Sequence, residues 1–226
     1  MATEYTVSLG ELLRDALVEL PGVVRSVAER ELLLTMQEFF DKTFVWTDIV
    51  KDVAPTTVET PIQVDDGDPY TRVIGILAVA IGKDGEGYSP LRPIPSRPYN
   101  ESSAGGLPSH FYITSNPDEF CLYPYMNDVS TYDLTVEVAL SPLLDISAYD
   151  TGQNIFPRQI IMKYYDAIMQ GFLARMYGHP NKPYSAPAVA QQLRHNFLRS
   201  IGYHAAQRKT GYNNSQNWRF PTGWRK

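Results

Sequence analysis

Residues 73–82 read VIGILAVAIG and form the most apolar stretch of the chain. A stretch of this length is too short to cross a membrane, and its Val and Ile content favours a buried strand. Similar short stretches rich in Val, Ile, Tyr and Thr accompany it: VETPIQV (58–64), HFYIT (110–114), EFCLYPY (119–125) and DLTVEVAL (133–140). Segments rich in Gly, Pro, Asn and Asp separate them, as is typical of antiparallel hairpins. The sequence therefore predicts a β module over residues 57–145.

One segment of this module has the composition of a loop. Residues 89–108, SPLRPIPSRPYNESSAGGLP, contain five prolines. Proline cannot donate a backbone hydrogen bond and is therefore excluded from the interior strands of a sheet. We expect a long, exposed, proline-rich loop here.

Helical periodicity occurs on both sides of the β module. Ser8 and Glu11 have the spacing of a capping box, and Pro21-Gly22 ends the first apolar-faced segment. A second helix is predicted from about Ser26 to Phe44, and two more by PRQIIMKYYDAIMQGFLARMYG (157–178) and SAPAVAQQLRHNFLRSIGYHAAQRK (185–209), with Ser185 as the N-cap of the last.

These patterns predict an α+β fold with three components. Residues 1–56 and 146–209 are expected to form a helical bundle from two N-terminal and two C-terminal helices. The antiparallel β module of residues 57–145 is inserted in it, and residues 210–226 form an extended C-terminal arm.

The charges are distributed unevenly along the chain. All 25 Asp and Glu residues and 11 of the 20 Lys and Arg residues lie in residues 1–166, which carry −14. The other nine cations lie in residues 167–226 with no acidic residue, giving the net charge of −5. Such asymmetry is typical of a nucleic-acid contact or an interaction tail. It also suits a head-to-tail oligomer, in which the basic end of one subunit meets the acidic body of another.

The sequence contains no recognisable catalytic or metal-binding motif. The Gly pair at 105–106 is not followed by a helix pattern, and the four histidines are not spaced as metal ligands. DDGDP (65–69) lacks the later ligands of a calcium loop and predicts a turn. The single cysteine, Cys121, excludes an internal disulfide and is expected to be a small buried apolar side chain. We therefore expect no enzyme activity, no metal and no cofactor.

The last fourteen residues, NNSQNWRFPTGWRK (213–226), combine two Trp, one Phe and three cations. Three interpretations remain open: docking on a partner protein, docking on the chain's own core, and binding of nucleic acid. The uneven aromatic spacing, interrupted by Pro221 and Gly223, favours an extended peptide that lies in grooves of a partner. The candidate docking residues of this arm are Trp218, Arg219, Phe220, Trp224, Arg225 and Lys226. The candidate interface residues of the preceding helix are Arg194, Arg199, Arg208 and Lys209.

The order of the segments resembles the head-to-tail adaptor (connector) proteins of tailed bacteriophages. The resemblance is carried, in chain order, by ELPGVVRSVAERELLLTMQEFFDKTFVW (19–46), LPSHFYITSNPDEFCLYPY (107–125), DLTVEVALSP (133–142), ARMYGHPNKPYSAPAVA (174–190) and QQLRHNFLRSIGYHAAQRKTGY (191–212). Each motif consists of common packing and turn residues, so the order of the motifs carries the likeness.

The resemblance implies a structural protein of the virion, located at the head–tail junction and made in the host cytoplasm. It implies a self-assembled ring, typically of twelve copies, between the portal protein and a tail (nozzle or tube) protein. Genomic DNA would pass through the channel without sequence-specific binding, and no membrane would be involved. The arm would reach onto the portal. The alternative function is a single-stranded nucleic-acid-binding module with a basic aromatic arm.

Overall fold

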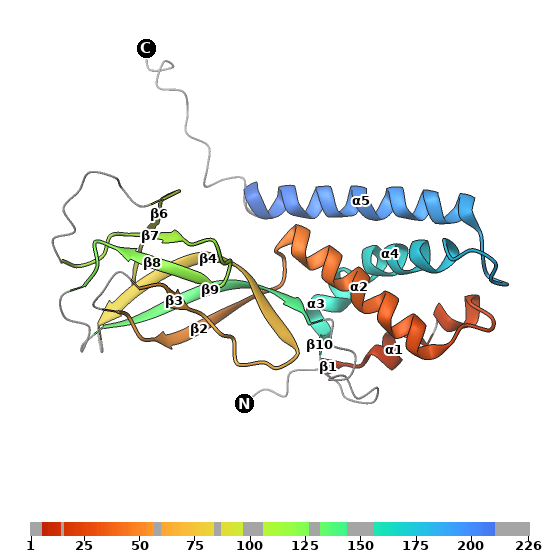
Figure 1. Cartoon of the computed structure of the whole chain (residues 1–226), viewed down its shortest axis with the longest axis horizontal. Coiled ribbons are helices and arrows are strands. Elements are labelled where there is room, and N and C mark those ends of the chain that lie inside the picture. The colour runs from red at the N-terminus through yellow and green to blue at the C-terminus, as the bar shows by residue number, and fades with distance from the viewer. Residues whose placement is uncertain are drawn as a thin grey trace, which may run out of the picture.

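The structure, a computed structural model, describes residues 6–14, 16–56, 60–83, 87–96, 106–126, 132–143 and 156–210. It confirms the mixed α+β class. The strands of the two larger sheets lie on one side of the molecule and the helices on the other (Figure 1). None of the described helices is both long enough and apolar enough to cross a membrane.

The helical elements, in chain order, are α1 (Leu9–Leu13), the 3-10 helix η1 (Ala16–Glu19), α2 (Arg25–Thr43), α3 (Arg158–Lys163), α4 (Tyr165–Tyr177) and α5 (Pro187–Thr210). The strands are β1 (Thr6–Val7), β2 (Thr47–Val53), β3 (Ile62–Gln63), β4 (Thr71–Lys83), β5 (Ser89–Pro90), β6 (Arg92–Pro93), β7 (His110–Ile113), β8 (Glu119–Tyr123), β9 (Tyr132–Pro142) and β10 (Phe156–Pro157).

Two four-stranded sheets have the strand orders β2-β9-β4-β5 and β3-β8-β7-β6, and β1 pairs with β10. The pairs are antiparallel except for β6 with β7. The longest pair is β4 with β9, from Thr71 opposite Pro142 to Lys83 opposite Tyr132. The strand predicted over residues 73–82 is therefore confirmed. Its burial is one-sided, because Ile76, Val79 and Ile81 are at most 5% exposed whereas alternate positions are more accessible.

Strand β2 was not anticipated from the sequence, where its residues were assigned to the helical bundle. It pairs with β9, with Thr47 opposite Ala139 and Val53 opposite Leu134. Its register shifts between Val50 and Val53, where Asp52 has a left-handed φ of 57°. Charged side chains and irregular pairing are typical of strands at a sheet edge. Because of these features, the sequence of β2 does not show the alternation of apolar and polar residues from which a strand is predicted.

The proline-rich segment is more ordered than the predicted exposed loop. Ser89–Pro90 pairs with β4 and Arg92–Pro93 with β7, each at the edge of its sheet. Leu91 between them is 7% exposed, and its N–H donates to the carbonyl of Val79 at 2.8 Å. The expectation of a loop is therefore wrong for residues 89–93, because proline is tolerated in edge strands. Residues 97–105 lie outside the described part.

The N-terminal helices follow the sequence with small changes. The N–H of Glu11 donates to Ser8 Oγ at 3.1 Å, which confirms Ser8 as the N-cap of α1. Helix α1 ends at Leu13, before η1. Helix α2 begins one residue before the predicted start, without a side-chain cap, and ends at Thr43, where Phe44 is the C-cap in the left-handed region with φ 53°.

The C-terminal helices differ from the prediction at two places. The single helix predicted over 157–178 is divided at Tyr164, whose φ of −113° and ψ of 11° interrupt the helix between α3 and α4. Helix α5 begins at Pro187, and the N–H of Ala190 donates to the carbonyl of Ala186 at 2.9 Å. Ala186, rather than the predicted Ser185, therefore directly precedes the helix, and Pro187 occupies the first helical position, where its missing N–H costs little.

Helices α2, α4 and α5 contact one another around fully buried aromatic rings. Phe39 of α2 lies with its ring centroid 6.3 Å from that of Phe197 of α5 and 5.4 Å from that of Tyr164. Gly171 of α4 lies against both neighbours, since a Cβ at this position would be 2.6 Å from Thr35 and 2.7 Å from Phe197. The absence of a side chain at Gly171 allows the three helices to approach this closely.

Candidate functional site

Helix α5 carries the four interface residues predicted on a helix, and it lies along the outer edge of the helical part (Figure 1). The structure separates these residues. Arg194 and Arg208 contact carboxylates of the same chain, Arg199 is exposed, and Lys209 lies in the last turn. The predicted arm residues lie outside the described residues: Trp218, Arg219, Phe220, Trp224, Arg225 and Lys226.

Arg194 joins α5 to α2 through Glu38. Its Nη1 donates to Glu38 Oε2 at 2.7 Å, and its Nη2 donates to Oε1 at 2.6 Å. Arg175 Nη2 of α4 donates to Oε2 at 2.9 Å, and Lys42 Nζ donates to Oε1 at 2.7 Å. Three helices therefore meet at one carboxylate, whose side chain is only 13% exposed. Arg194 is part of the fold and is not available as a free docking cation.

Burial of Glu38 by itself would raise the pKa of its carboxyl group, but the cations oppose this effect. Hydrogen bonds from Arg194, Lys42 and Arg175 lower the pKa of Glu38 from 4.5 to about 2. Because the folded-state pKa lies below the ordinary value, this carboxylate stabilises the fold above pH 4.5. Its contribution is lost as the pH falls toward 2.

We expect Glu38→Gln to lower the free energy of unfolding at pH 7 by about 1–3 kcal/mol, because Arg194 loses its counter-ion and Arg175 keeps only the longer pair with Glu31 at 3.6 Å. The variant should also lose the part of the acid dependence between pH 4.5 and 2 that arises from this group. Urea unfolding over a pH series measures both effects. Glu11→Gln, which removes a more exposed pair with Arg158, is the matched control and should cost about 0–1 kcal/mol. An unchanged acid slope in Glu38→Gln would contradict the assignment.

Arg208 joins α5 to the larger sheet. Its Nη2 donates to Oε1 of Glu137 on β9 at 2.6 Å, and both side chains are about one-third exposed. The two parts of the molecule are therefore linked by an ion pair between residues far apart in sequence. Among the arginines predicted on α5, only Arg199 is exposed and has no partner within the described part of the chain.

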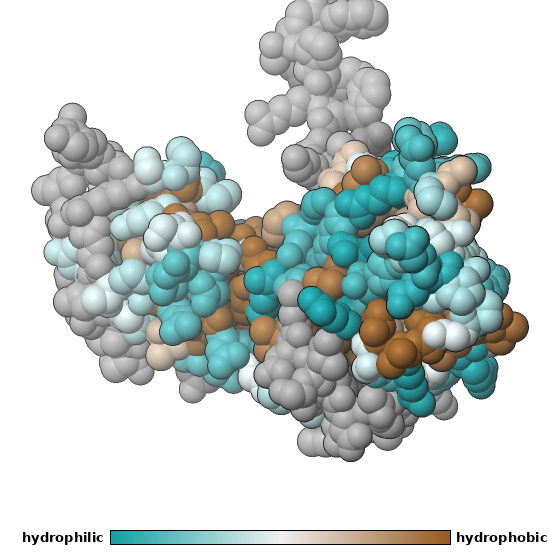
Figure 2. All heavy atoms as spheres, turned by 45° about the vertical axis from the view of Figure 1, so that its right-hand side comes forward, coloured by the Kyte–Doolittle hydropathy of each residue, from teal (hydrophilic) through white to brown (hydrophobic). Residues whose placement is uncertain are grey.

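Apolar side chains are also exposed at the end of the helical part. Val18 is 82% exposed, Val24 is 63% exposed and Val27 is 38% exposed, all around η1 and the start of α2. The space-filling view shows hydrophobic residues gathered on this lower side of the helical part (Figure 2). Contiguous exposed apolar surface is typical of protein contact sites. Helical periodicity indicates the buried face of a helix and does not reveal this exposed apolar surface.

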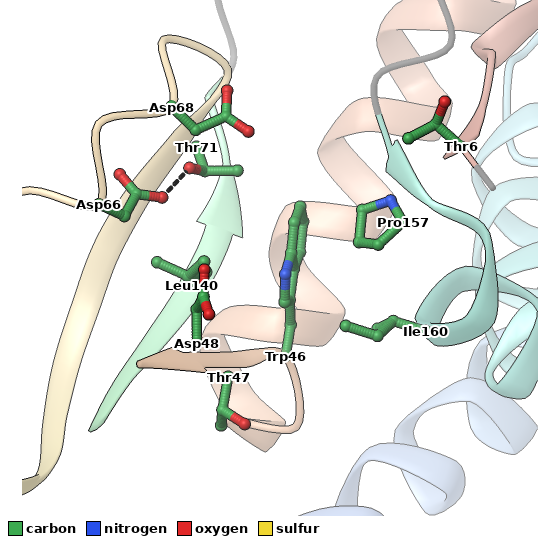
Figure 3. Close-up of a pocket in the computed structure, with 10 residues that line it drawn as sticks. All are labelled: Thr6, Trp46, Thr47, Asp48, Asp66, Asp68, Thr71, Leu140, Pro157 and Ile160. Carbon is green, nitrogen blue, oxygen red and sulfur yellow. Dashed lines mark hydrogen bonds between the residues drawn. The ribbon is translucent and has the colours of Figure 1, made fainter. Parts of the chain in front are cut away.

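A groove of about 160 Å³ lies between the sheets and the helices. Trp46, Leu140 and Ile160 are among its walls, and one side carries the carboxylates of Asp48, Asp66 and Asp68 (Figure 3). The sequence predicted a turn at residues 65–69. It gave no indication that Asp48 of β2 lies close to this turn.

The turn itself is confirmed by local geometry. Gly67 has a left-handed φ of 73°, and its N–H donates to Asp65 Oδ1 at 3.0 Å. The N–H of Tyr70 donates to Asp68 Oδ1 at 2.9 Å. These bonds fix the loop that carries Asp66 and Asp68 over the groove.

Burial raises the pKa of Asp66, and the negative charge of Asp68 adds to this effect, although the hydroxyl of Thr71 donates a hydrogen bond to Asp66. Within the described residues, none of the groove's three aspartates forms an ion pair with Lys or Arg. The described His, Cys, Asp and Glu side chains do not include a group of three or more that could hold a metal ion. The groove therefore presents unpaired negative charge beside an apolar wall.

Comparison with known proteins identifies the family to which the chain belongs. No curated protein matches the chain. The sequence profile described as "SU10 adaptor protein" matches residues 7–219, which includes the described helices, the described strands except Thr6 of β1, and part of the C-terminal segment. The profile thus covers the same succession of helix, β module and helix that carries the resemblance to connector proteins. The chain belongs to the SU10 adaptor protein family, a family of phage head–tail adaptors.

Proposed function

We propose that this protein forms a ring between the portal and the tail of a phage particle and extends the channel through which DNA passes. Membership of the adaptor family over residues 7–219 is the observation that carries this proposal. The family is a structural one, and its members are components of the virion. A ring of twelve copies, joined head to tail, is the assembly we propose.

Each segment of the chain is assigned one part of the proposed adaptor. Residues 1–56 and 146–209 supply the helical bundle, residues 57–145 the β module, and residues 210–226 the arm that docks on the portal. Helix α5 lies along the outer edge of the helical part and directly precedes the arm in the sequence (Figure 1). The opposite charges of residues 1–166 and 167–226 favour contacts between unlike faces of neighbouring copies.

The alternative, a single-stranded nucleic-acid-binding module, has less support. Phosphate binding needs cations that are free to contact the backbone of the nucleic acid. Arg194 and Arg208 are instead bonded to Glu38 and Glu137 of the same chain. The described surface of α5 therefore offers little of the basic track that this function requires.

Negative-stain imaging of the cognate portal, with and without this protein, tests the proposed function. We expect added ring-shaped density on the tail side of the portal. The protein alone should be monomeric or weakly associated. A docking arm and polar contact faces suit a ring that assembles only on the portal, which acts as its template. Absence of any added density would contradict the adaptor role. A stable ring of the isolated protein, detected by native mass measurement, would contradict only assembly on the template.

A further inference from the structure

The outer face of α5 forms no ion pair in the described part of the chain, and the hydroxyl of its Tyr203 accepts a hydrogen bond from Gln207 Nε2 of the same helix at 2.6 Å. Its exposed side chains include Arg199 and Tyr203, which are one helical turn apart, and Leu198 beside them. Tyr203 is 60% exposed and Leu198 is 44% exposed. The helix contains no acidic residue, so this face carries the single positive charge of Arg199 beside the partly apolar surface of Leu198 and Tyr203.

The acidic groove lies on the opposite edge of the molecule. Helix α5 runs along the upper edge in Figure 1, whereas β1 and β10, which contribute Thr6 and Pro157 to the groove, lie at the lower edge. Asp48 and Asp68 are exposed there and have no cationic partner among the described residues. The two surfaces are complementary in charge, but one molecule cannot bring them together.

We propose that the outer face of α5 in one copy docks against the groove beside Trp46 in the next copy, with Arg199 between Asp48 and Asp68. The contact joins two different surfaces and is therefore heterologous. Repetition of such a contact closes a ring when the rotation between copies is a fraction of a full turn. The inference rests on the proposed ring and assigns the two faces that form it.

The chemistry of the groove suits a guanidinium group. Arginine presents a rigid fork of donors that matches carboxylates, and it binds well beside apolar and aromatic surface. The groove volume of about 160 Å³ accommodates the end of one such side chain. A cation placed there would also relieve the mutual repulsion of Asp66 and Asp68.

Disulfide cross-linking tests the contact directly. Arg199→Cys and Asp48→Cys are introduced together in one chain, and the protein is oxidised both free and bound to the portal. Cys121 remains in place because it is 4% exposed. We expect a ladder of cross-linked multimers from the double variant, and dimers only from a mixture of the two single variants. Lys182→Cys combined with Asp48→Cys is the matched control, since Lys182 is exposed outside the proposed face, and it should give no ladder.

Two outcomes would overturn the proposal. Dimers from Arg199→Cys alone would show a symmetric contact between two α5 helices. Absence of the ladder in both the free and the portal-bound protein would show that the two faces do not meet. Portal binding is scored independently by imaging. A missing ladder with intact portal binding therefore rejects only this interface, whereas a ladder without portal binding rejects only the adaptor role.

Charge reversal gives a second, independent test. Arg199→Glu and Asp48→Lys should each raise the protein concentration needed for half-saturation of the portal by about tenfold, because each places like charges together. The two changes in one chain restore an opposite pair at every interface, and half-saturation should return to within about threefold of the original value. Lys182→Glu should leave it unchanged. Failure of the double variant to recover would show that Arg199 and Asp48 act separately.

Discussion

Removal of residues 213–226 is expected to abolish binding to the portal while the protein stays folded. The segment contains three large aromatic side chains and three cations, which are the residue types that dominate binding energy at protein interfaces. Its apolar residues follow no helical or alternating period, so the sequence does not mark it as part of a core. Circular dichroism should show unchanged helix content, and a pull-down with the portal should show no binding.

Single substitutions distinguish groove docking from charge attraction in this arm. Trp218→Ala and Trp224→Ala should each weaken portal binding by about 2 kcal/mol or more if the indoles fill pockets. Arg225→Ala, near the end of the chain, should cost about 0–1 kcal/mol. A larger loss for Arg225→Ala, with strong dependence on ionic strength, would identify an electrostatic tether instead. Unfolding of the truncated protein would show that the arm belongs to the chain's own core.

Phe39→Ala is expected to lower the free energy of unfolding by about 3–5 kcal/mol. The side chain is fully buried, and its ring centroid lies 5.4 Å from those of Phe40 and Tyr164 and 5.9 Å from that of His204. Truncation of the Phe39 side chain would leave a cavity between α2, α5 and Tyr164, the residue at which α3 ends and α4 begins. Because stabilities of single domains are of order 5–15 kcal/mol, such a loss should shift the urea midpoint strongly.

Phe39→Leu is the control for this effect. It keeps most of the apolar volume and should cost clearly less than Phe39→Ala, on the order of 1–2 kcal/mol. Val24→Ala, at a side chain that is 63% exposed, should change the free energy of unfolding by no more than about 0.5 kcal/mol. Similar losses for Phe39→Ala and Val24→Ala would show that the helical core does not depend on the aromatic cluster.

Together, the expected effects separate two roles of the C-terminal region. The inner face of α5 stabilises the fold through Phe197, Arg194 and Arg208. Its outer face, with Arg199 and Tyr203, is exposed and is assigned by the proposal to the neighbouring copy. Substitutions on the inner face should therefore change unfolding, and those on the outer face should change assembly.

The sequence by itself determined those elements of the fold that depend on local signals. The Ser8 cap, the turn at 65–69, the end of α4 at Gly178 and the strands β4 and β9 each follow from residues within a few positions of one another. The order of motifs also indicated the adaptor family, which the profile match confirmed. Caps, turns and periodicity involve neighbouring residues and are therefore visible in one chain.

Only the tertiary structure decided which cations are free to contact a partner and which strands pair in the same sheet. Arg194 looked like a surface cation until Glu38, 156 positions away, was placed beside it. Gly171 carries no sequence signal for the close contact of α4 with Thr35 and Phe197. Strand β2 and the groove's Asp48 depend on pairing with β9, which is distant in the chain. Such contacts arise from packing between remote segments, so their partners are known only when the chain is folded.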